Sequence, residues 1–343
     1  LKFGIDMLNR AKEEGNEIAV DLIDIEEVGE DDYCAMVAAL GSPVAMLDTS
    51  LPMFGPDAVY AFKAFQKASL AEGKKVKYLY SGEMGGMNTF VPILVAILSD
   101  KDVDKRIKLV DADSNGRAVP ELNTTLNSFY GHPPTPMGLG SVNGDEIAVY
   151  PVSDHAGEQI ARQMCMLYDM RIGFSTWGMS KAEIKEALAL GCISKAQQIG
   201  KAIFAAKANG TDVMEELKKV MEIREFCRGT LEKLDLRQEG GFDFGTTVVK
   251  GEDGKKYYID FKNENLILRD EDGKALLTAP EGIGTIDLDT LTPLTNADTK
   301  EGQHLLVTMT PAHPNWWDED HKAYTCWLPE LRKVGLEGDQ VRY

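Results

Sequence analysis

The first half of the chain alternates short apolar runs with segments of helical periodicity. The apolar runs are short and strand-like, as in buried strands of a sheet, and they span residues 18–23, 34–40, 76–80 and 107–110. Residues 56–72 have the spacing of an amphipathic helix, with Pro56 at its start and Gly73 just after its end. This alternation predicts an α/β fold with a mostly parallel, Rossmann-like sheet.

The pattern changes in the second half of the chain. Residues 180–224 have helical spacing, and short alternating runs follow at 246–249, 257–261 and 266–268. The turn pairs Asp253-Gly254 and Asp272-Gly273 punctuate this β-rich region, as in hairpin turns. We therefore predict an α/β domain over residues 1–170. A smaller α+β domain over residues 171–343 would combine a helical segment with a β-rich C-terminal part.

The apolar run at 107–110 ends in a pair of acids. Asp111 and Asp113 follow it one residue apart, and the turn residues Asn115 and Gly116 come next. Burying a carboxylate costs several kcal/mol unless it is paired, hydrogen-bonded or close to solvent. The favoured interpretation therefore places these acids at the carboxyl edge of the sheet, where open α/β folds hold their ligands.

A glycine-rich loop follows the preceding predicted strand. Residues 81–88 read SGEMGGMN and include Glu83, Gly85, Gly86 and Asn88. Glycines let backbone N–H groups approach an anion or a carbonyl, and a helix that begins near Thr89 would add a positive partial charge. The loop matches neither G-x-G-x-x-G nor a P-loop, because no Lys-Ser/Thr follows the glycines.

If the two strands are parallel neighbours, the glycine loop and the acids open onto one crevice, together with Arg117. The structural alternative is that Asn88 caps a helix, the glycines ease a turn, and Arg117 pairs with Glu121. An EF-hand calcium loop is a weaker alternative, because its twelfth position is Leu122 rather than Glu and a strand is predicted before it.

The composition narrows the classes of function. The 343 residues are 43% hydrophobic and carry a formal net charge of −18, which argues against a nucleic-acid partner because such proteins present basic stripes. No apolar run approaches the ~18 residues that a membrane helix needs. The cysteines contain no C-x-x-C pair, which indicates free core thiols in a cytoplasmic protein: Cys34, Cys165, Cys192, Cys227 and Cys326.

The two central motifs resemble the DUF917 family. They are SGEMGGMN at 81–88, followed by Val91-Pro92, and VDADSNGRAVPEL at 110–122; EGGF at 239–242, NENL at 263–266 and the run at 302–307 match as well. The resemblance covers nearly the whole chain and implies an α/β domain followed by a β-containing one. The named activity of the family is S-methyl thiohydantoin desulfurase, and its members are associated or fused with hydantoinase/oxoprolinase proteins. Family members open with a run of glycines just before the first helix, and this sequence starts after that point; if those glycines form part of the pocket, they would supply one wall of it.

The resemblance implies a hydrolase-type enzyme that acts on a small five-membered cyclic amide, such as an S-methyl thiohydantoin or a hydantoin. Such chemistry needs a general base, a stabiliser of developing charge and groups that hold the ring. We assign Asp113 first and Asp111 second as the base, Glu83 to the same crevice, and Arg117 as the stabiliser. The expected binding residues are Gly85 and Gly86 through their amides, Asn88, Glu121 and His132 in the first domain, and Asn263 and Glu264, which would close the pocket from the second. The alternative for residues 263–265 is a polar turn between two strands.

Two further alternatives belong to other classes. In one, the chain is a non-catalytic partner subunit of a hydantoinase/oxoprolinase-type enzyme. In the other, Asp111 and Asp113 bind a divalent metal, which is the one candidate cofactor, and the protein is a metal-assisted hydrolase. The candidate partners are a small cyclic amide substrate, a hydantoinase/oxoprolinase-type protein and further copies of the chain, with no nucleic acid and no membrane.

Overall fold

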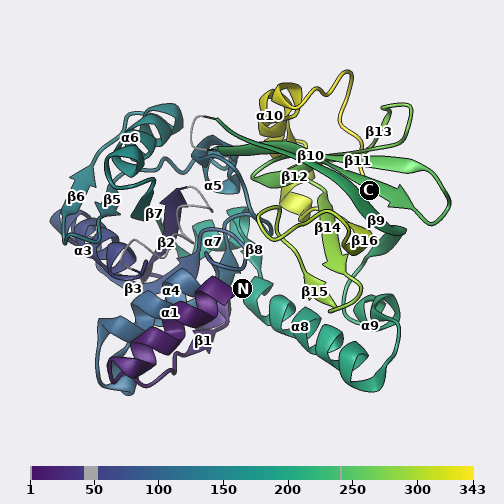
Figure 1. Cartoon of the computed structure of the whole chain (residues 1–343). Helices are drawn as coiled ribbons and strands as arrows, with labels where there is room; N and C mark the ends of the chain where they lie inside the picture. Colours follow the sequence, from purple (N-terminus) through teal and green to yellow (C-terminus); the bar gives the residue numbers. More distant parts are fainter. Residues whose placement is uncertain (1, 42–52, 240–241) are drawn as a thin grey trace. The chain divides into compact units, whose positions relative to one another are not determined.

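The computed structural model describes residues 2–41, 53–239 and 242–343. They form two compact units, Leu1–Ile193 and Ser194–Tyr343 (Figure 1). Gly240 and Gly241 of the EGGF motif lie outside the described residues. Within the described ranges, no helix is both long enough and apolar enough to cross a membrane.

The first unit is built on sheet A and the helices that cover it. Its strands are β1 (Leu22–Ile23), β2 (Tyr33–Gly41), β3 (Val76–Ser81), β4 (Lys108–Asp113), β5 (Met137–Gly140), β6 (Glu146–Val149), β7 (Arg171–Ser180) and β8 (Ala189–Leu190). Its helices are α1 (Lys2–Glu13), α3 (Pro56–Ala71), α4 (Phe90–Ser99), α5 (Leu126–Phe129), α6 (Asp154–Leu167) and α7 (Lys181–Ala187), with the short 3-10 helices η1 (Ile25–Glu27), η2 (Val103–Lys105) and η3 (Leu122–Thr124).

The strands of sheet A are ordered β1-β4-β3-β2-β7-β5-β6, and β8 pairs with β4. The pairs β1·β4, β4·β3 and β3·β2 are parallel, whereas β7, β5, β6 and β8 join by antiparallel pairing. Because β7 pairs with β2, the first unit continues past residue 170, where the sequence pattern suggested a division.

Both faces of sheet A are covered, and the alternation of side chains in β2 shows why its sequence is continuously apolar. Met36 and Ala38 lie in one core cluster, whereas Val37 and Ala39 lie in the other. The first cluster includes Ala161 and Cys165 of α6 and Ile184 and Ala187 of α7; the second includes Met7 and Ala11 of α1, Phe62 and Phe65 of α3, and Leu94 and Val95 of α4. A strand buried on both faces needs apolar residues at every position.

The second unit is built on sheet B. Its strands are β9 (Arg224–Glu239), β10 (Phe242–Gly251), β11 (Lys256–Lys262), β12 (Glu264–Arg269), β13 (Ala275–Thr278), β14 (Gly282–Asp287), β15 (Thr292–Pro293) and β16 (His304–Thr310). Its helices are α8 (Cys192–Asn209), which begins in the first unit, α9 (Val213–Lys218) and α10 (Trp327–Lys333), with the 3-10 helices η4 (Pro314–Trp317) and η5 (Ala323–Cys326). The strand order is β13-β12-β11-β10-β9-β16-β14-β15, and the neighbours are antiparallel. The predicted α/β class with a strand-rich second part is confirmed.

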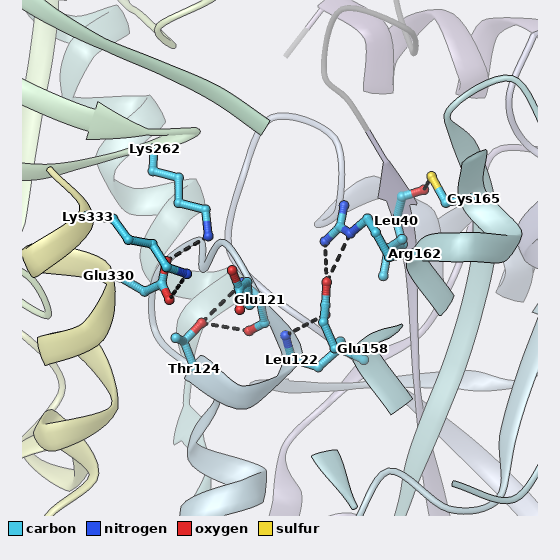
Figure 2. A network of polar contacts seen from close by, with 10 residues as sticks. All are labelled: Leu40, Glu121, Leu122, Thr124, Glu158, Arg162, Cys165, Lys262, Glu330 and Lys333. Carbon is cyan, nitrogen blue, oxygen red and sulfur yellow. Dashed lines mark hydrogen bonds and ion pairs between the residues drawn. The ribbon is translucent and has the colours of Figure 1, made fainter. Parts of the chain in front are cut away.

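A buried ion pair joins α10 to the end of β11 within the second unit. The Lys262 ammonium lies 2.7 Å from a carboxylate oxygen of Glu330, and both side chains are almost fully buried (Figure 2). Lys333 contacts the other oxygen of Glu330 at 2.7 Å, and the ring of Phe242 lies 3.9 Å from the Lys262 ammonium. Buried charges are tolerated when they are paired in this way, so removing one partner would leave the other uncompensated.

Helix α3 packs directly on sheet A because glycines leave room for its backbone. A Cβ atom at Gly138 would lie 2.2 Å from the carbonyl oxygen of Ala61, and one at Gly173 would lie 2.1 Å from that of Asp57. These are contacts with helix backbone, which a side-chain rotation cannot relieve. The glycines therefore set the distance between α3 and the sheet.

We predict that Gly173→Ala destabilises the protein by about 1–3 kcal/mol or more, because α3 must move away from the sheet. Gly200→Ala in α8 is the matched control: a Cβ atom at Gly200 would meet nothing beyond its own helix within 4 Å, so the change should stabilise the helix by up to about 1 kcal/mol. Thermal unfolding of both variants measures the difference. Equal melting temperatures for Gly173→Ala and the wild type would contradict the close packing.

Candidate active site

The carboxyl ends of β3 and β4 lie side by side at one edge of sheet A. In this parallel pair, Ser81 is the register partner of Asp113. The glycine loop after β3 and the turn after β4 therefore leave the sheet at the same place. The prediction that these two loops are neighbours is confirmed.

Asp113 is a buried acid whose two oxygens have different surroundings. Its Oδ1 accepts hydrogen bonds from the backbone N–H groups of Asn115 (2.7 Å) and Gly116. Its Oδ2 is buried and has no hydrogen-bond partner among the described residues. Burial raises the pKa of Asp113 to about 7, and the charge of Glu83 acts in the same direction, while the N–H donors oppose it. The carboxyl group can therefore exchange a proton near neutral pH.

Asn88 ties the glycine loop to the neighbouring strand β2. Its Oδ1 accepts the N–H of Ala39 (2.8 Å) and its Nδ2 donates to the carbonyl of Ala39 (3.2 Å), as a paired strand residue would. The same amide group donates to Glu83 Oε1 (2.6 Å). Asn88 thus holds the Glu83 carboxylate in position, and α4 begins after it, at Phe90.

Hydrogen bonds also join the glycine loop to the turn after β4. Asn115 donates from Nδ2 to the carbonyl of Gly82 (3.0 Å), and the N–H of Val119 donates to Glu83 Oε2 (2.9 Å). Burial raises the pKa of Glu83, although its hydrogen bonds and the charge of Arg117 oppose this shift. The two loops therefore form one polar network that contains two acids of raised pKa.

The segment after this turn is fixed from α6. Glu158 accepts the N–H of Leu122 (3.0 Å), and Arg162, one helical turn later, lies 2.6 Å from Glu158 Oε1 (Figure 2). Thr124 donates from Oγ1 to the backbone carbonyl of Glu121 (2.6 Å). Glu121 thus lies at the start of η3, a short helical turn that α6 holds in place.

Asp111 meets the start of α8. Its Oδ1 accepts the N–H of Ile193 (2.8 Å), and its backbone carbonyl accepts the N–H of Gly191 (2.8 Å). The first N–H groups of a helix have no partner within the helix, so a carboxylate here acts as a cap supplied from another element. This contact gives Asp111 a structural role that its sequence position did not indicate.

Cys192 lies beside the acids, although the sequence pattern indicated a core thiol. Ala189 in β8 is the register partner of Asp113, and the Cys192 thiol donates to the carbonyl of Ala189 (3.4 Å). Burial raises the pKa of the thiol, and the charges of Asp113 and Asp111 raise it further. No local motif could have marked Cys192, because the pairing of β8 with β4 brings it to the site.

The amide of Gly85 has a hydrogen-bond partner within its own loop, and its role in holding a ring oxygen stays a prediction. Its N–H donates to Thr89 Oγ1 (3.0 Å), because the loop folds back on itself before α4. Gly86 lies next to α1. If Gly4 of α1 carried a Cβ atom, that atom would lie 3.0 Å from the carbonyl oxygen of Gly86. The binding role of the Gly86 amide stays a prediction.

Arg117 and His132 lie in different surroundings. Arg117 donates from Nε to the carbonyl of Ala118 (3.0 Å), and its charge acts on Glu83. His132 Nδ1 lies 3.8 Å from an oxygen of Glu183, at the first turn of α7. In the described part of the chain, no hydrogen bond or ion pair joins His132 to Glu83 or Asp113.

Asn263 and Glu264 belong to the second unit. Asn263 has a positive φ of 56° between β11 and β12. Its Oδ1 accepts the N–H of Asp243 (2.9 Å), and its own N–H donates to the carbonyl of Asp243 (2.7 Å). The carboxamide thus has a partner within its own unit, as the polar-turn alternative requires. A contribution of Asn263 and Glu264 to the site stays a prediction.

The calcium-loop alternative is wrong. The element before the loop is the strand β4 rather than a helix, and Asp113 uses Oδ1 to close its own turn. Across the described ranges, no group of three or more His, Cys, Asp or Glu side chains is arranged to hold a metal ion.

Two family models match the chain in succession. The S-Me-THD-like N-terminal domain matches residues 3–150, and the S-Me-THD-like C-terminal domain matches residues 152–329. The chain belongs to the S-Me-THD-like family. This membership confirms the resemblance to the DUF917, S-methyl thiohydantoin desulfurase-like family that the two central motifs indicated. The boundary between the two family domains falls between β6 and α6, inside the first compact unit.

The fold of this family member is also found in a solved structure. An X-ray crystal structure of a protein from Chromobacterium violaceum matches with a TM-score of 0.76 and 23% sequence identity, over 98% of this chain and 92% of that one. At this identity the match shows a shared fold. A comparison with curated proteins found no match.

The raised pKa of Asp113 makes the stability of the protein depend on pH. In the unfolded chain this carboxyl loses its proton near its ordinary pKa of 3.8, whereas in the folded protein it does so at about 7. The folded state therefore holds an extra proton across this window, and we expect wild-type stability to fall as the pH rises through it. Asp113→Asn keeps the shape without a charge to bury, so it should be more stable than the wild type by roughly a few kcal/mol at pH 8 and by little at pH 4.

Urea unfolding of both proteins at the two pH values measures this difference. Asp21→Asn is the control, because Asp21 is an exposed acid at the surface and its replacement should change stability little at either pH. A stability gap between Asp113→Asn and the wild type that does not grow with pH would show that the pKa of Asp113 is not raised.

Proposed function

We propose that the chain is an enzyme that hydrolyses a small five-membered cyclic amide of the hydantoin type, with an S-methyl thiohydantoin as the first substrate to test. The observation that carries this proposal is the Asp113 carboxyl, which is buried, has a pKa of about 7 and has one oxygen without a partner among the described residues. A general base works best when its pKa lies near the working pH. Membership of the S-Me-THD-like family supports the hydantoin-related substrate class.

In the proposed reaction, water adds to the ring carbon that bears the S-methyl group. Asp113 takes one proton from the water as the C–O bond forms, the electron pair of the C=N bond moves to the ring nitrogen, and Asp113 passes its proton to that nitrogen. The carbonyl then forms as the C–S bond breaks, and the proton of the new hydroxyl group passes through Asp113 to the sulfur, which leaves as methanethiol. One water is consumed, the ring becomes a hydantoin, and Asp113 returns to its ionised form.

Glu83 and Arg117 have supporting roles in this proposal. The charge of Glu83 favours the protonated form of Asp113 and so makes it a stronger base. Arg117 would stabilise the negative charge that develops on the ring, since its guanidinium is permanently charged and acts on the same network. Asp111 is the weaker candidate for the base, because its Oδ1 caps the start of α8 through the N–H of Ile193, whereas the pKa of Asp113 is raised to about 7.

We predict that Asp113→Asn lowers turnover of an S-methyl thiohydantoin by roughly 10²–10⁴-fold, because the amide cannot accept the proton of water. Asp111→Asn is the matched control: it lies two residues away, and its amide oxygen can still cap α8, so its activity should stay within a few-fold of wild type. Release of methanethiol measures both. A larger loss in Asp111→Asn than in Asp113→Asn would reverse the assignment.

The dependence of kcat/KM on pH is a second measurement of the same assignment. We expect activity to rise with an apparent pKa near 7, since the base must be ionised. Two outcomes favour the other classes of function. Turnover only after addition of a hydantoinase/oxoprolinase-type protein would indicate a partner subunit. Loss of turnover with a chelator, restored by a divalent metal, would indicate a metal-assisted hydrolase.

A further inference from the structure

Two polar side chains at the ends of β3 and β4 point to the same face of sheet A. Ser81 and Asp113 are register partners in this parallel pair. The residues before them, Tyr80 and Ala112, both belong to the core cluster on the side of α6 and α7. Because side chains alternate between the two faces of a strand, Ser81 and Asp113 both point to the opposite face, which α1, α3 and α4 cover.

Each of these side chains has a buried polar atom without a partner. Neither residue has any exposed surface, and the Ser81 Oγ and the Asp113 Oδ2 make no hydrogen bond within the described ranges. The two atoms are therefore not bonded to each other. Buried polar groups almost always have a hydrogen-bond partner, and a bound water supplies it where the protein does not.

The spacing of the strands suits one small molecule between these two atoms. Neighbouring strands lie about 4.8 Å apart, and the N–H of Ser114 donates to the carbonyl of Ser81 (3.1 Å), which holds the strand ends together. Asp113 is limited in its rotation because its Oδ1 accepts the N–H groups of Asn115 (2.7 Å) and Gly116. A water can accept from the hydroxyl and donate to the carboxylate, so it matches both groups.

The pair also lies close to the surface of the first unit. Gly85 is exposed four residues after Ser81, and Gly116 is exposed three residues after Asp113. Only a few residues of each loop therefore separate the pair from solvent.

We propose that Ser81 and Asp113 hold one water molecule between them and that this water is the nucleophile of the hydrolysis. The inference rests on the proposed function and adds Ser81 to the groups that act in it. The Ser81 hydroxyl donates to the water oxygen, and the water donates one O–H to Asp113 Oδ2. A lone pair of the water oxygen forms the bond to the ring carbon as that proton moves to Oδ2. The later steps are those of the proposed reaction, and the Ser81 hydroxyl keeps its own proton throughout.

Ser81 contributes orientation to this step. A water held by the carboxylate alone can rotate about that single hydrogen bond, whereas a second bond fixes its oxygen relative to the ring carbon. Because the hydroxyl contacts the water and not the ring, its removal should lower kcat and leave KM nearly unchanged.

A high-resolution crystal structure of the full chain tests the water site without any substrate. We expect an ordered water within hydrogen-bonding distance of both Ser81 Oγ and Asp113 Oδ2, and we expect Ser81→Ala to lose it. A wild-type crystal structure with no water between these two atoms overturns the inference, whether or not the protein turns over a hydantoin.

Kinetics with an S-methyl thiohydantoin test the role of this water. Ser81→Ala should lower kcat by about 10–10²-fold, with KM and the melting temperature unchanged. Ser81→Thr keeps the hydroxyl and should recover most of the lost kcat. Ser69→Ala is the matched control, because Ser69 of α3 is also buried and its hydroxyl likewise has no partner in the described part of the chain; it should behave as the wild type.

The possible failures are distinguishable. A wild-type kcat in Ser81→Ala, together with an inactive Asp113→Asn, overturns the inference and leaves the proposed function in place. Parallel losses of kcat and melting temperature in Ser81→Ala would show a structural role and overturn it as well. Where Ser81→Thr does not fold, the crystal structure and Ser81→Ala still decide. No turnover by the wild type, alone or with a partner protein, overturns the proposed function and with it the role of the water as nucleophile.

Discussion

The parallel pairing of β3 with β4 is the constraint on which the candidate site depends. It places Asp113 next to Ser81 at the end of two strands that are buried on both faces. Desolvation there disfavours the charged carboxylate. The two N–H groups of the following turn offset this cost at Oδ1, whereas Oδ2 receives no such compensation from the described residues. The raised pKa of Asp113 is therefore a consequence of where the strand ends.

Because β3 and β4 end at the same edge of the sheet, hydrogen bonds join the glycine loop to the turn after β4. Glu83 is held by Asn88 and by the N–H of Val119, and Asn115 reaches back to Gly82. Each of these bonds uses a polar group that would otherwise be costly to bury. The network thus stabilises the fold and also fixes the acids in one geometry, which catalysis by positioned groups requires.

The likeness to the Chromobacterium violaceum structure shows how little identity such a fold needs. With 23% identity, the two chains still match over 98% of this one. Strand burial depends on apolar character and volume more than on particular residues. Close packing of a helix backbone on a strand restricts the residue type more strongly. A Cβ atom at Gly173 would lie 2.1 Å from the carbonyl oxygen of Asp57 in α3. Positions of this kind limit substitution more than most of the core does.

Much of this protein follows from its sequence alone. Short apolar runs determine β2, β3 and β4, and Pro56 marks the start of α3, because these signals act over a few residues. The positive φ angles of Gly254 and Gly273 likewise agree with the hairpin turns read from the sequence. The meeting of the glycine loop with the acids was also predictable, since parallel strands end at a common edge.

The tertiary structure alone decided what the individual side chains contact. Asp111 became a helix cap and Cys192 a neighbour of Asp113 through the pairing of β8 with β4, and His132 came to lie beside Glu183. Antiparallel β7 extended the first unit in the same way, through its pairing with β2. Hydrophobic periodicity reports which positions are buried. The partner of a buried polar atom depends on residues far away in the chain, so only the folded structure identifies it.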